Sequence, residues 1–253
     1  MKQIANTETA LNATARALAR RKGVNVSMKG NDYTTPLSLA SAILLPNTNI
    51  LDSAKDAVRF RGELDLAALS KRFHDHTAHI KKRPLREKEA EVYDRLETMR
   101  IEILGAREGM KGLSHNLSER FDEQCNQDRN LPSETDAPWG DMLSALVRQS
   151  AIGEAPPNAL MPHLSQWQLS IERHARLLID KLAASVVSQD AYSKLTQQLI
   201  EALGGIESEY GKSAMQFAPQ ETAEESDGQM ENTDNEHVES TEGDATDYSQ
   251  QLG

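Results

Sequence analysis

The spacing of apolar residues along the chain predicts a protein built mainly from helices. Residues 7–22 carry an apolar stripe that ends at Gly23, and from about residue 52 onward apolar positions recur at steps of three and four. Between Leu164 and Val186 these steps run 3, 4, 4, 3, 4, 4 without interruption. We expect helices over residues 7–22, from about 52, from Pro84 to about 103, over 139–149, over 163–187, and from Ser188 to Gly204-Gly205.

Two short segments near the N-terminus follow a different pattern, which is typical of strands. Residues 24–28 alternate apolar and polar positions, and residues 37–45 form an apolar stretch between Pro36 and Pro46. Gly30-Asn31-Asp32 supplies turn residues between them. We therefore predict a mainly α, multi-helix domain over residues 1–212 that includes a small β-hairpin at about 24–45. Aromatic residues are only 4% of the chain, which suits helices packed on helices.

The negative charge of the protein is concentrated at one end. The chain has a formal net charge of −11, and residues 213–253 contain eleven acids with no Lys or Arg. Residues 1–212 are balanced, with 28 acids and 28 bases. The composition of residues 213–253 predicts a disordered acidic tail or linker, because such a segment cannot bury enough apolar surface to fold.

A neutral body and an acidic tail argue against binding of nucleic acid, which needs a net basic surface. The one local basic stretch, Lys81-Lys82-Arg83, is followed by Glu87 and Glu89, so it favours a solvated helix face of mixed charge. No run of apolar residues approaches the roughly 18 that a membrane helix requires, and the N-terminus has no apolar signal core. We expect a cytoplasmic protein.

Familiar catalytic and nucleotide-binding patterns do not fit this sequence. Gly211-Lys212-Ser213 lacks the preceding glycine of a phosphate-binding loop, since Ile206 stands at that position. The only cysteine, Cys125, excludes a disulfide framework and a zinc cluster of cysteines. No serine is framed as G-x-S-x-G. We therefore expect no catalytic residue and no directly bound cofactor in this chain.

The only cluster of histidines is His74-Asp75-His76-x-x-His79. On a helix, Asp75 and His79 lie one turn apart, so His74, Asp75 and His79 are weak candidates for metal ligands. None of the histidine pairs has the four-residue spacing of helical zinc motifs. A structural hydrogen bond between Asp75 and His79, or exposed residues without a role, are the alternatives, and we expect no bound metal.

A second polar stretch follows from Arg100 to Arg107, two helical turns apart and therefore on one side of a helix. Between them, Gly105 permits close approach of another backbone. One interpretation is a surface that contacts a partner through Arg100, Glu102, Gly105 and Arg107. The alternative is an ion-pair ladder within the helix, because Glu97 lies three residues before Arg100.

This stretch resembles the T subunit family of aerobic, ATP-dependent cobaltochelatase (the CobT family), and the resemblance covers most of residues 7–212. The most specific part is Glu97-x-x-Arg100-Ile101-Glu102-x-x-Gly105-Ala106-Arg107 followed by Gly112-Leu113-x-x-Asn116-Leu117. Other similar segments are Arg61-Gly62, Ala67-Ala68-Leu69, His74-Asp75-x-x-x-His79, Ala155-Pro156-Pro157, the helix with Trp167 and Ile171-Glu172, and Glu209-Tyr210-Gly211.

The resemblance implies a non-motor subunit of an enzyme that forms nitrogen–metal bonds, inserting Co²⁺ into hydrogenobyrinic acid a,c-diamide during cobalamin biosynthesis. It also implies an AAA+ ATPase ring subunit and a large tetrapyrrole-binding subunit as partners. The complex would use ATP, magnesium and cobalt, and this chain would not be catalytic alone. The alternative is a helical adaptor of an AAA+ motor whose target is unrelated to cobalamin.

The sequence departs from the family pattern at two points. The stretch between Gly105 and Asn116 is one residue longer than in the family. Family members also continue past the acidic linker into a von Willebrand A domain with a metal-ion adhesion site, whereas this sequence ends at Gly253. We therefore expect a fragment, a split gene product or a naturally short relative.

Overall fold

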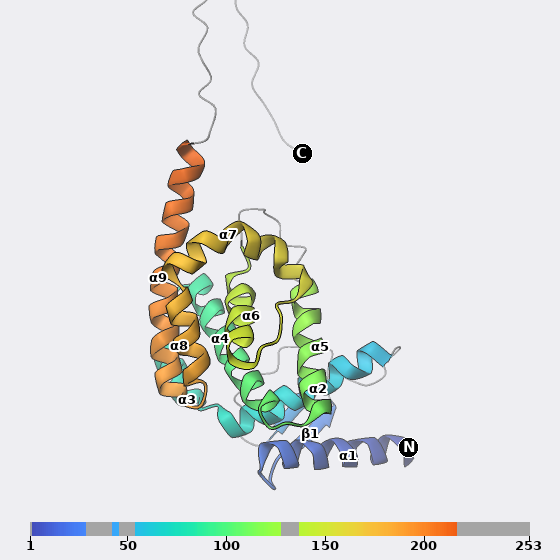
Figure 1. The fold of residues 1–253 in the computed structure, drawn as a ribbon. Coiled ribbons are helices and arrows are strands. Elements are labelled where there is room, and N and C mark those ends of the chain that lie inside the picture. Colours follow the sequence, from blue (N-terminus) through green and yellow to red (C-terminus); the bar gives the residue numbers. More distant parts are fainter. Residues whose placement is uncertain (1, 29–41, 46–53, 128–136, 217–253) are drawn as a thin grey trace, which may run out of the picture.

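A computed structural model describes residues 2–28, 42–45, 54–127 and 137–216, and most of these are helical (Figure 1). A two-stranded sheet lies near the N-terminus. The mainly α fold is therefore confirmed. Of the predicted disordered tail over residues 213–253, the first four residues belong to a helix instead, and the rest lies outside the described residues. The elements are α1 (Lys2–Ala19), β1 (Asn25–Met28), β2 (Ala42–Leu45), α2 (Ala54–Phe73), α3 (His76–Lys82), α4 (Glu87–Ala106), α5 (Lys111–Gln127), α6 (Trp139–Ile152), η3 (Asn158–Leu160), α7 (Met161–His174), α8 (Arg176–Ser185) and α9 (Gln189–Gln216).

The two strands pair in parallel, with Asn25 opposite Ala42 and Met28 opposite Leu45. The predicted small sheet is confirmed, but the predicted hairpin at about 24–45 is wrong. A hairpin reverses the chain through a tight turn, whereas parallel strands need a longer crossover between them. The turn signal at residues 30–32 was the basis of the hairpin prediction, and it lies outside the described residues.

The sheet is held against α1 by contacts of both side chain and backbone. Arg16 Nε donates a hydrogen bond to the carbonyl oxygen of Val24 over 2.8 Å, and the backbone N–H of Val26 donates to Asn12 Oδ1 over 2.7 Å. Val26 and Ile43 are buried in a small core that also contains residues of α1, α2 and α5. The short strands are thus stabilised by packing on helices, as a two-stranded sheet in water is marginal alone.

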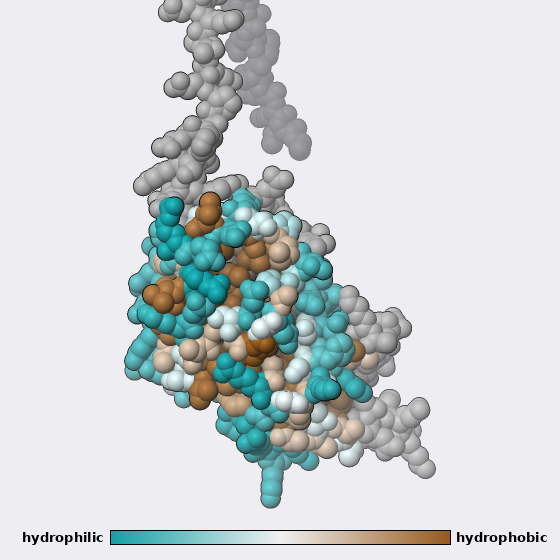
Figure 2. All heavy atoms as spheres, viewed as in Figure 1, coloured by the Kyte–Doolittle hydropathy of each residue, from teal (hydrophilic) through white to brown (hydrophobic). Residues whose placement is uncertain are grey.

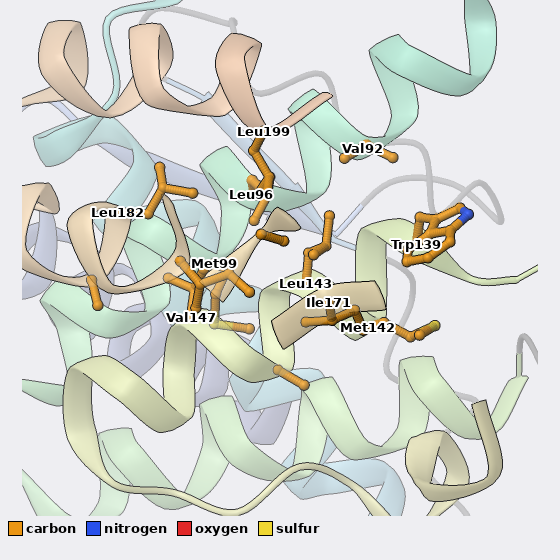
Figure 3. Packing of buried hydrophobic residues seen from close by; sticks show 14 of the residues in the cluster. Val92, Leu96, Met99, Trp139, Met142, Leu143, Val147, Ile171, Leu182 and Leu199 are labelled. Atoms are coloured by element: carbon orange, nitrogen blue, oxygen red, sulfur yellow. The ribbon is translucent and has the colours of Figure 1, made fainter. Parts of the chain in front are cut away.

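A larger core lies between α4, α6, α8 and α9. Figure 3 shows side chains from these helices converging from different directions. Each fully buried aliphatic side chain contributes about 1.5–3 kcal/mol, so this core makes a large contribution to the stability of the domain. The labelled residues at its centre are Leu96 and Met99 of α4, Leu143 and Val147 of α6, Leu182 of α8, and Leu199 of α9.

The helix predicted over residues 163–187 is two helices in the structure, and this prediction was wrong. α7 and α8 meet at Ala175, whose φ of −117° interrupts the helical backbone. Ala175 is buried, as are Ile171 before it and Ile179 after it. Both helices turn their apolar side toward the same core, so the regular spacing continues through the break and hides it.

The last described helix, α9, begins where the sequence predicts, with Ser188 Oγ accepting a hydrogen bond from the N–H of Ala191 over 3.3 Å. The predicted end at Gly204-Gly205 is wrong, because the helix continues to Gln216. Gly204 does not have the positive φ that a terminating glycine adopts, in contrast to Gly153 after α6, where φ is +76°. The C-terminal part of α9 (orange) extends beyond the other helices in Figure 1.

The surface is mainly hydrophilic on the face shown in Figure 2, with hydrophobic residues in several small patches between hydrophilic ones. The large apolar side chains that α7 and α8 expose are Met161, Leu169 and Leu177. None of the described helices combines the length and apolar character that crossing a bilayer requires.

Candidate functional site

The histidine cluster lies where α2 ends and α3 begins. The ring centroids of His74 and His79 are 4.9 Å apart and the rings meet edge to face, while the centroid of the exposed His76 lies 6.2 Å from that of His74. The side chains of His74 and His79 are almost completely buried. The structure therefore brings together two of the three residues that the sequence suggested as metal ligands.

Asp75, the third candidate, has a different role. It is the N-cap of α3, and its Oδ1 accepts a hydrogen bond from the backbone N–H of Ala78 over 3.0 Å. The predicted side-chain hydrogen bond between Asp75 and His79 is wrong, because His79 Nε2 lies 2.9 Å from Asp94 Oδ1 of α4 instead. Asp75 is also fixed by Gln189, which accepts from its N–H and donates to its carbonyl oxygen.

Asp94 joins His79 to the end of α3. Its carboxylate accepts hydrogen bonds from Arg83 in addition to the contact with His79. Arg83 Nη2 lies 2.7 Å from Oδ2, and Arg83 Nε is shared between Oδ2 at 2.9 Å and Oδ1 at 3.0 Å. Partial burial works to raise the pKa of Asp94, but the bonds from His79 and Arg83 outweigh it and lower the pKa below its ordinary value. Asp94 is therefore an anion that orients the His79 ring.

Glu97, one turn further along α4, performs the same role for His74. Its Oε1 lies 2.7 Å from His74 Nδ1, and both of its oxygens accept from Arg100 over 2.8 Å. Burial works to raise the pKa of Glu97, yet the bonds from Arg100 and His74 lower it overall. The sequence analysis paired Glu97 with Arg100 but missed its bond to His74, because 23 residues separate the two and no local pattern links them.

Arg100 of α4 connects this helix to α2 and α8 from the interior. Its side chain is 1% exposed, and besides Glu97 it donates to the carbonyl oxygen of Val186 from Nη1 over 3.0 Å and to that of Phe73 from Nη2 over 2.7 Å. These carbonyls stand at the ends of α8 and α2, where the helix leaves acceptors unpaired. The alternative interpretation of an ion pair within the helix is confirmed for Glu97 and Arg100.

Glu102 and Gly105 are also internal. Glu102 Oε1 accepts from both Nε and Nη2 of the buried Arg120 on α5. Gly105 lies against side chains of α2 and α5, and a Cβ there would stand 3.1 Å from Leu117 Cδ1. Gly105 thus allows close packing, as predicted, but the neighbours are helices of this chain.

Arg107 is the exposed member of the four residues predicted to contact a partner. Its Nη2 donates to the carbonyl oxygens of Ala151 over 3.2 Å and Ala183 over 3.4 Å, near the ends of α6 and α8. Because Arg100, Glu102 and Gly105 are enclosed by the domain, the predicted contact surface reduces to Arg107 and the residues around it.

Two other sequence interpretations concern charged segments. Lys82 pairs with Asp190 and Arg83 with Asp94, as expected for a face of mixed charge rather than a basic patch. Gly211-Lys212-Ser213 lies within α9, so it is helix and not the loop that cradles phosphate. Both observations agree with the sequence analysis.

Among the described residues, one group could hold a metal ion by proximity: ligand atoms of His74, His79 and Glu97 lie within 4.8 Å of one another. Asp94 supports this group through His79. The two carboxylates come from α4, His74 comes from the segment between α2 and α3, and His79 lies within α3. Only the tertiary fold reveals this set.

Comparison with known proteins identifies the family. No solved structure matches the chain. The model of the family described as "Cobalamin biosynthesis protein CobT" matches residues 3–252, which is nearly the whole sequence. The match includes all the elements described above and agrees with the resemblance carried by residues 97–117. The chain therefore belongs to the CobT family of cobalamin biosynthesis proteins.

Proposed function

We propose that this chain is a non-motor subunit of an ATP-dependent cobaltochelatase and that it docks on an AAA+ ring subunit. The observation that carries the proposal is the family match over residues 3–252. In this proposal, ATP and magnesium are used by the ring, and cobalt is a substrate that a large subunit inserts into hydrogenobyrinic acid a,c-diamide. The chain itself binds no cofactor in the reaction and contributes an assembly surface.

The internal ion pairs support a role as a stiff connecting body. Arg100 holds the ends of α2 and α8, and Arg120 joins α5 to α4 through Glu102. Buried pairs of this kind are costly to break, since removing one partner leaves an uncompensated charge in the interior. These bonds therefore oppose movement of α2, α5 and α8 relative to α4.

The turn between α4 and α5 is the docking surface that we favour. It contains Arg107, and Met110 beside it is a large apolar side chain that is 45% exposed. Glu108 completes a short charged edge through ion pairs with Arg20 and Arg72. An exposed apolar residue surrounded by charges suits a contact with another protein.

The decisive experiment is size-exclusion chromatography with light scattering of this chain and its cognate AAA+ subunit, with and without ATP. We expect nucleotide-dependent co-migration that Arg107→Glu weakens at least tenfold, while Arg176→Glu, at an exposed residue of α8, leaves it unchanged. Charge reversal at Arg100 is unsuitable as a test because the residue is buried. If folded Arg107→Glu binds like the wild type, the surface is elsewhere; if the wild type fails to bind, ring docking by this chain is refuted.

A second measurement separates the chelatase from an adaptor with an unrelated target. Cobalt insertion is followed by absorbance with the large subunit, the ring and ATP, in the presence and absence of this chain. Dependence of the rate on this chain supports the chelatase. A rate that does not change, together with intact docking, would favour the unrelated AAA+ adaptor.

A further inference from the structure

Each of the two buried histidines uses one ring nitrogen to bind a carboxylate. His74 Nδ1 lies 2.7 Å from Glu97 Oε1, and His79 Nε2 lies 2.9 Å from Asp94 Oδ1. A carboxylate accepts hydrogen bonds, so each contact places the ring proton on the nitrogen that faces the acid. In the neutral rings this leaves a lone pair on His74 Nε2 and on His79 Nδ1.

His74 Nε2 has no hydrogen-bonding partner although it is buried. The whole side chain of His74 is 1% exposed, so this nitrogen is not in contact with bulk water. A buried polar atom left unsatisfied costs about 1–3 kcal/mol. The neighbouring side chains of Glu97, Arg100 and Asp94 all have hydrogen-bonding partners. His74 Nε2 differs from them in having none.

A histidine held by a carboxylate through one nitrogen, with the other nitrogen unoccupied, is the usual arrangement of a metal ligand. His74 has this arrangement, and His79, held by Asp94 through its Nε2, lies beside it with ring centroids 4.9 Å apart. We propose that His74 and His79 form a binding site for a late first-row divalent cation such as Zn²⁺, Co²⁺ or Ni²⁺, with Glu97 and Asp94 as the positioning carboxylates.

The choice of metal follows from the ligands. Imidazole nitrogen binds Zn²⁺, Co²⁺ and Ni²⁺ in preference to Mg²⁺ or Ca²⁺, which take oxygen ligands. Ligands around a tetrahedral ion stand about 3.3 Å apart, given metal–nitrogen bonds near 2.0–2.1 Å. One ligand atom from each of His74, His79 and Glu97 lies within 4.8 Å of the other two, so the two imidazoles must rotate toward each other to bring two nitrogens to the tetrahedral spacing.

The charge of the surroundings indicates an exchangeable site rather than a permanent structural one. Arg100 and Arg83 already balance Glu97 and Asp94, so a bound dication is not neutralised by these acids. Glu97 is occupied by Arg100 and His74, and it acts through His74 rather than as a direct ligand. Two histidines then leave further coordination positions for water or for a donor from another molecule.

The test is metal titration of the untagged, full-length protein by isothermal titration calorimetry with ZnCl₂ and, separately, CoCl₂. We expect one equivalent of either ion, with visible d–d absorption for Co²⁺ typical of nitrogen and oxygen ligands. His79→Gln should weaken binding at least tenfold, and Asp94→Asn should weaken it about 10- to 100-fold. His115→Gln, at an exposed histidine of α5, is the matched control and should bind like the wild type.

A measurement on the wild type keeps the proposal testable if a variant does not fold. In ¹⁵N-detected spectra of the imidazoles, Zn²⁺ should shift the resonances of His74 and His79 and leave those of His115 and His163 unchanged. Absence of stoichiometric binding, binding that survives in folded His79→Gln, or shifts confined to other histidines would each overturn the site.

Discussion

Asn116 Nδ2 donates a hydrogen bond to Asp65 Oδ2 over 2.8 Å across the contact between α5 and α2. Asn116 belongs to the segment that carries the family resemblance, and its partner is an acid that is only 4% exposed. This bond gives the asparagine a structural role: it satisfies one oxygen of a carboxylate that the packing of two helices has removed from water.

Asp65 should make the stability of the protein depend on pH. Burial raises its pKa from 3.8 to about 6, and the bond from Asn116 only partly opposes the shift. Because the folded state then holds the proton more tightly than the unfolded state, Asp65 destabilises the fold above pH 6, and this penalty disappears as the pH falls from about 6 toward 3.8.

Asp65→Asn should therefore stabilise the protein at pH 8 by up to about 3 kcal/mol, given about 1.4 kcal/mol per pKa unit, and by much less near pH 4. Urea denaturation at both pH values measures this difference. Glu91→Gln on the exposed face of α4 controls for the loss of one charge. An equal effect of Asp65→Asn at the two pH values would contradict the claim that Asp65 is a buried anion at pH 8.

Gly62 lies at a close approach of α2 to α5. A Cβ at this position would stand 2.6 Å from the carbonyl oxygen of Asn116 and 2.8 Å from Arg120 Cβ. We expect Gly62→Ala to destabilise the protein by about 1–3 kcal/mol, because overpacking outweighs the gain in helix propensity. The matched control is Gly204→Ala in α9, where nothing lies within 4 Å, and it should stabilise by about 1 kcal/mol. Thermal denaturation distinguishes the two; stabilisation by Gly62→Ala would refute the tight crossing.

Replacement of Arg100 should have one of the largest effects in the chain. Arg100→Met leaves Glu97 charged and buried and removes the donors of the carbonyls of Phe73 and Val186. A loss of about 3–5 kcal/mol is expected. Arg176→Met, at an exposed residue of α8, serves as the control and should change stability by less than about 0.5 kcal/mol. A loss below 1 kcal/mol for Arg100→Met would show that the network is dispensable.

Arg120 and Glu102 should be strongly coupled. Each is buried, and the two contact each other through both Nε and Nη2 of the arginine. Arg120→Met and Glu102→Met should each destabilise by about 3 kcal/mol, whereas the double variant should recover much of that loss because no buried charge remains uncompensated. Chemical denaturation of the three variants gives the coupling energy, and strictly additive losses would contradict a direct interaction.

The sequence predicted helices well where the period of apolar residues reflects one face of one helix. It could also have predicted α5, since Leu113, Leu117, Phe121 and Cys125 are spaced by four residues and are all buried. The break at Ala175 could not be predicted, because the apolar spacing serves one core across two helices. Strand direction escaped prediction for a similar reason: a turn signal does not specify the path that follows it.

The candidate site was predicted only in part, because its contacts are non-local. The sequence indicated His74 and His79, yet their carboxylate partners Glu97 and Asp94 lie on another helix. It also placed Arg100 and Glu102 on an outer surface, since charge on a helix usually faces solvent. Both are buried because each finds a partner of opposite charge inside the domain. The polarity of a residue alone does not show whether it lies on a docking surface or is paired inside the domain.

The 28-residue helix α9 begins within the main core and ends beyond it (Figure 1). At 1.5 Å per residue it is about 42 Å long. Besides contributing to the core, it therefore sets the distance and the rotation of its far end relative to the core. One residue inserted into its projecting part would advance everything beyond by about 1.5 Å and turn it by about 100°, whereas seven residues would restore the orientation to within about 20°. The orientation of the last described turn of α9 relative to the core is thus set by a residue count.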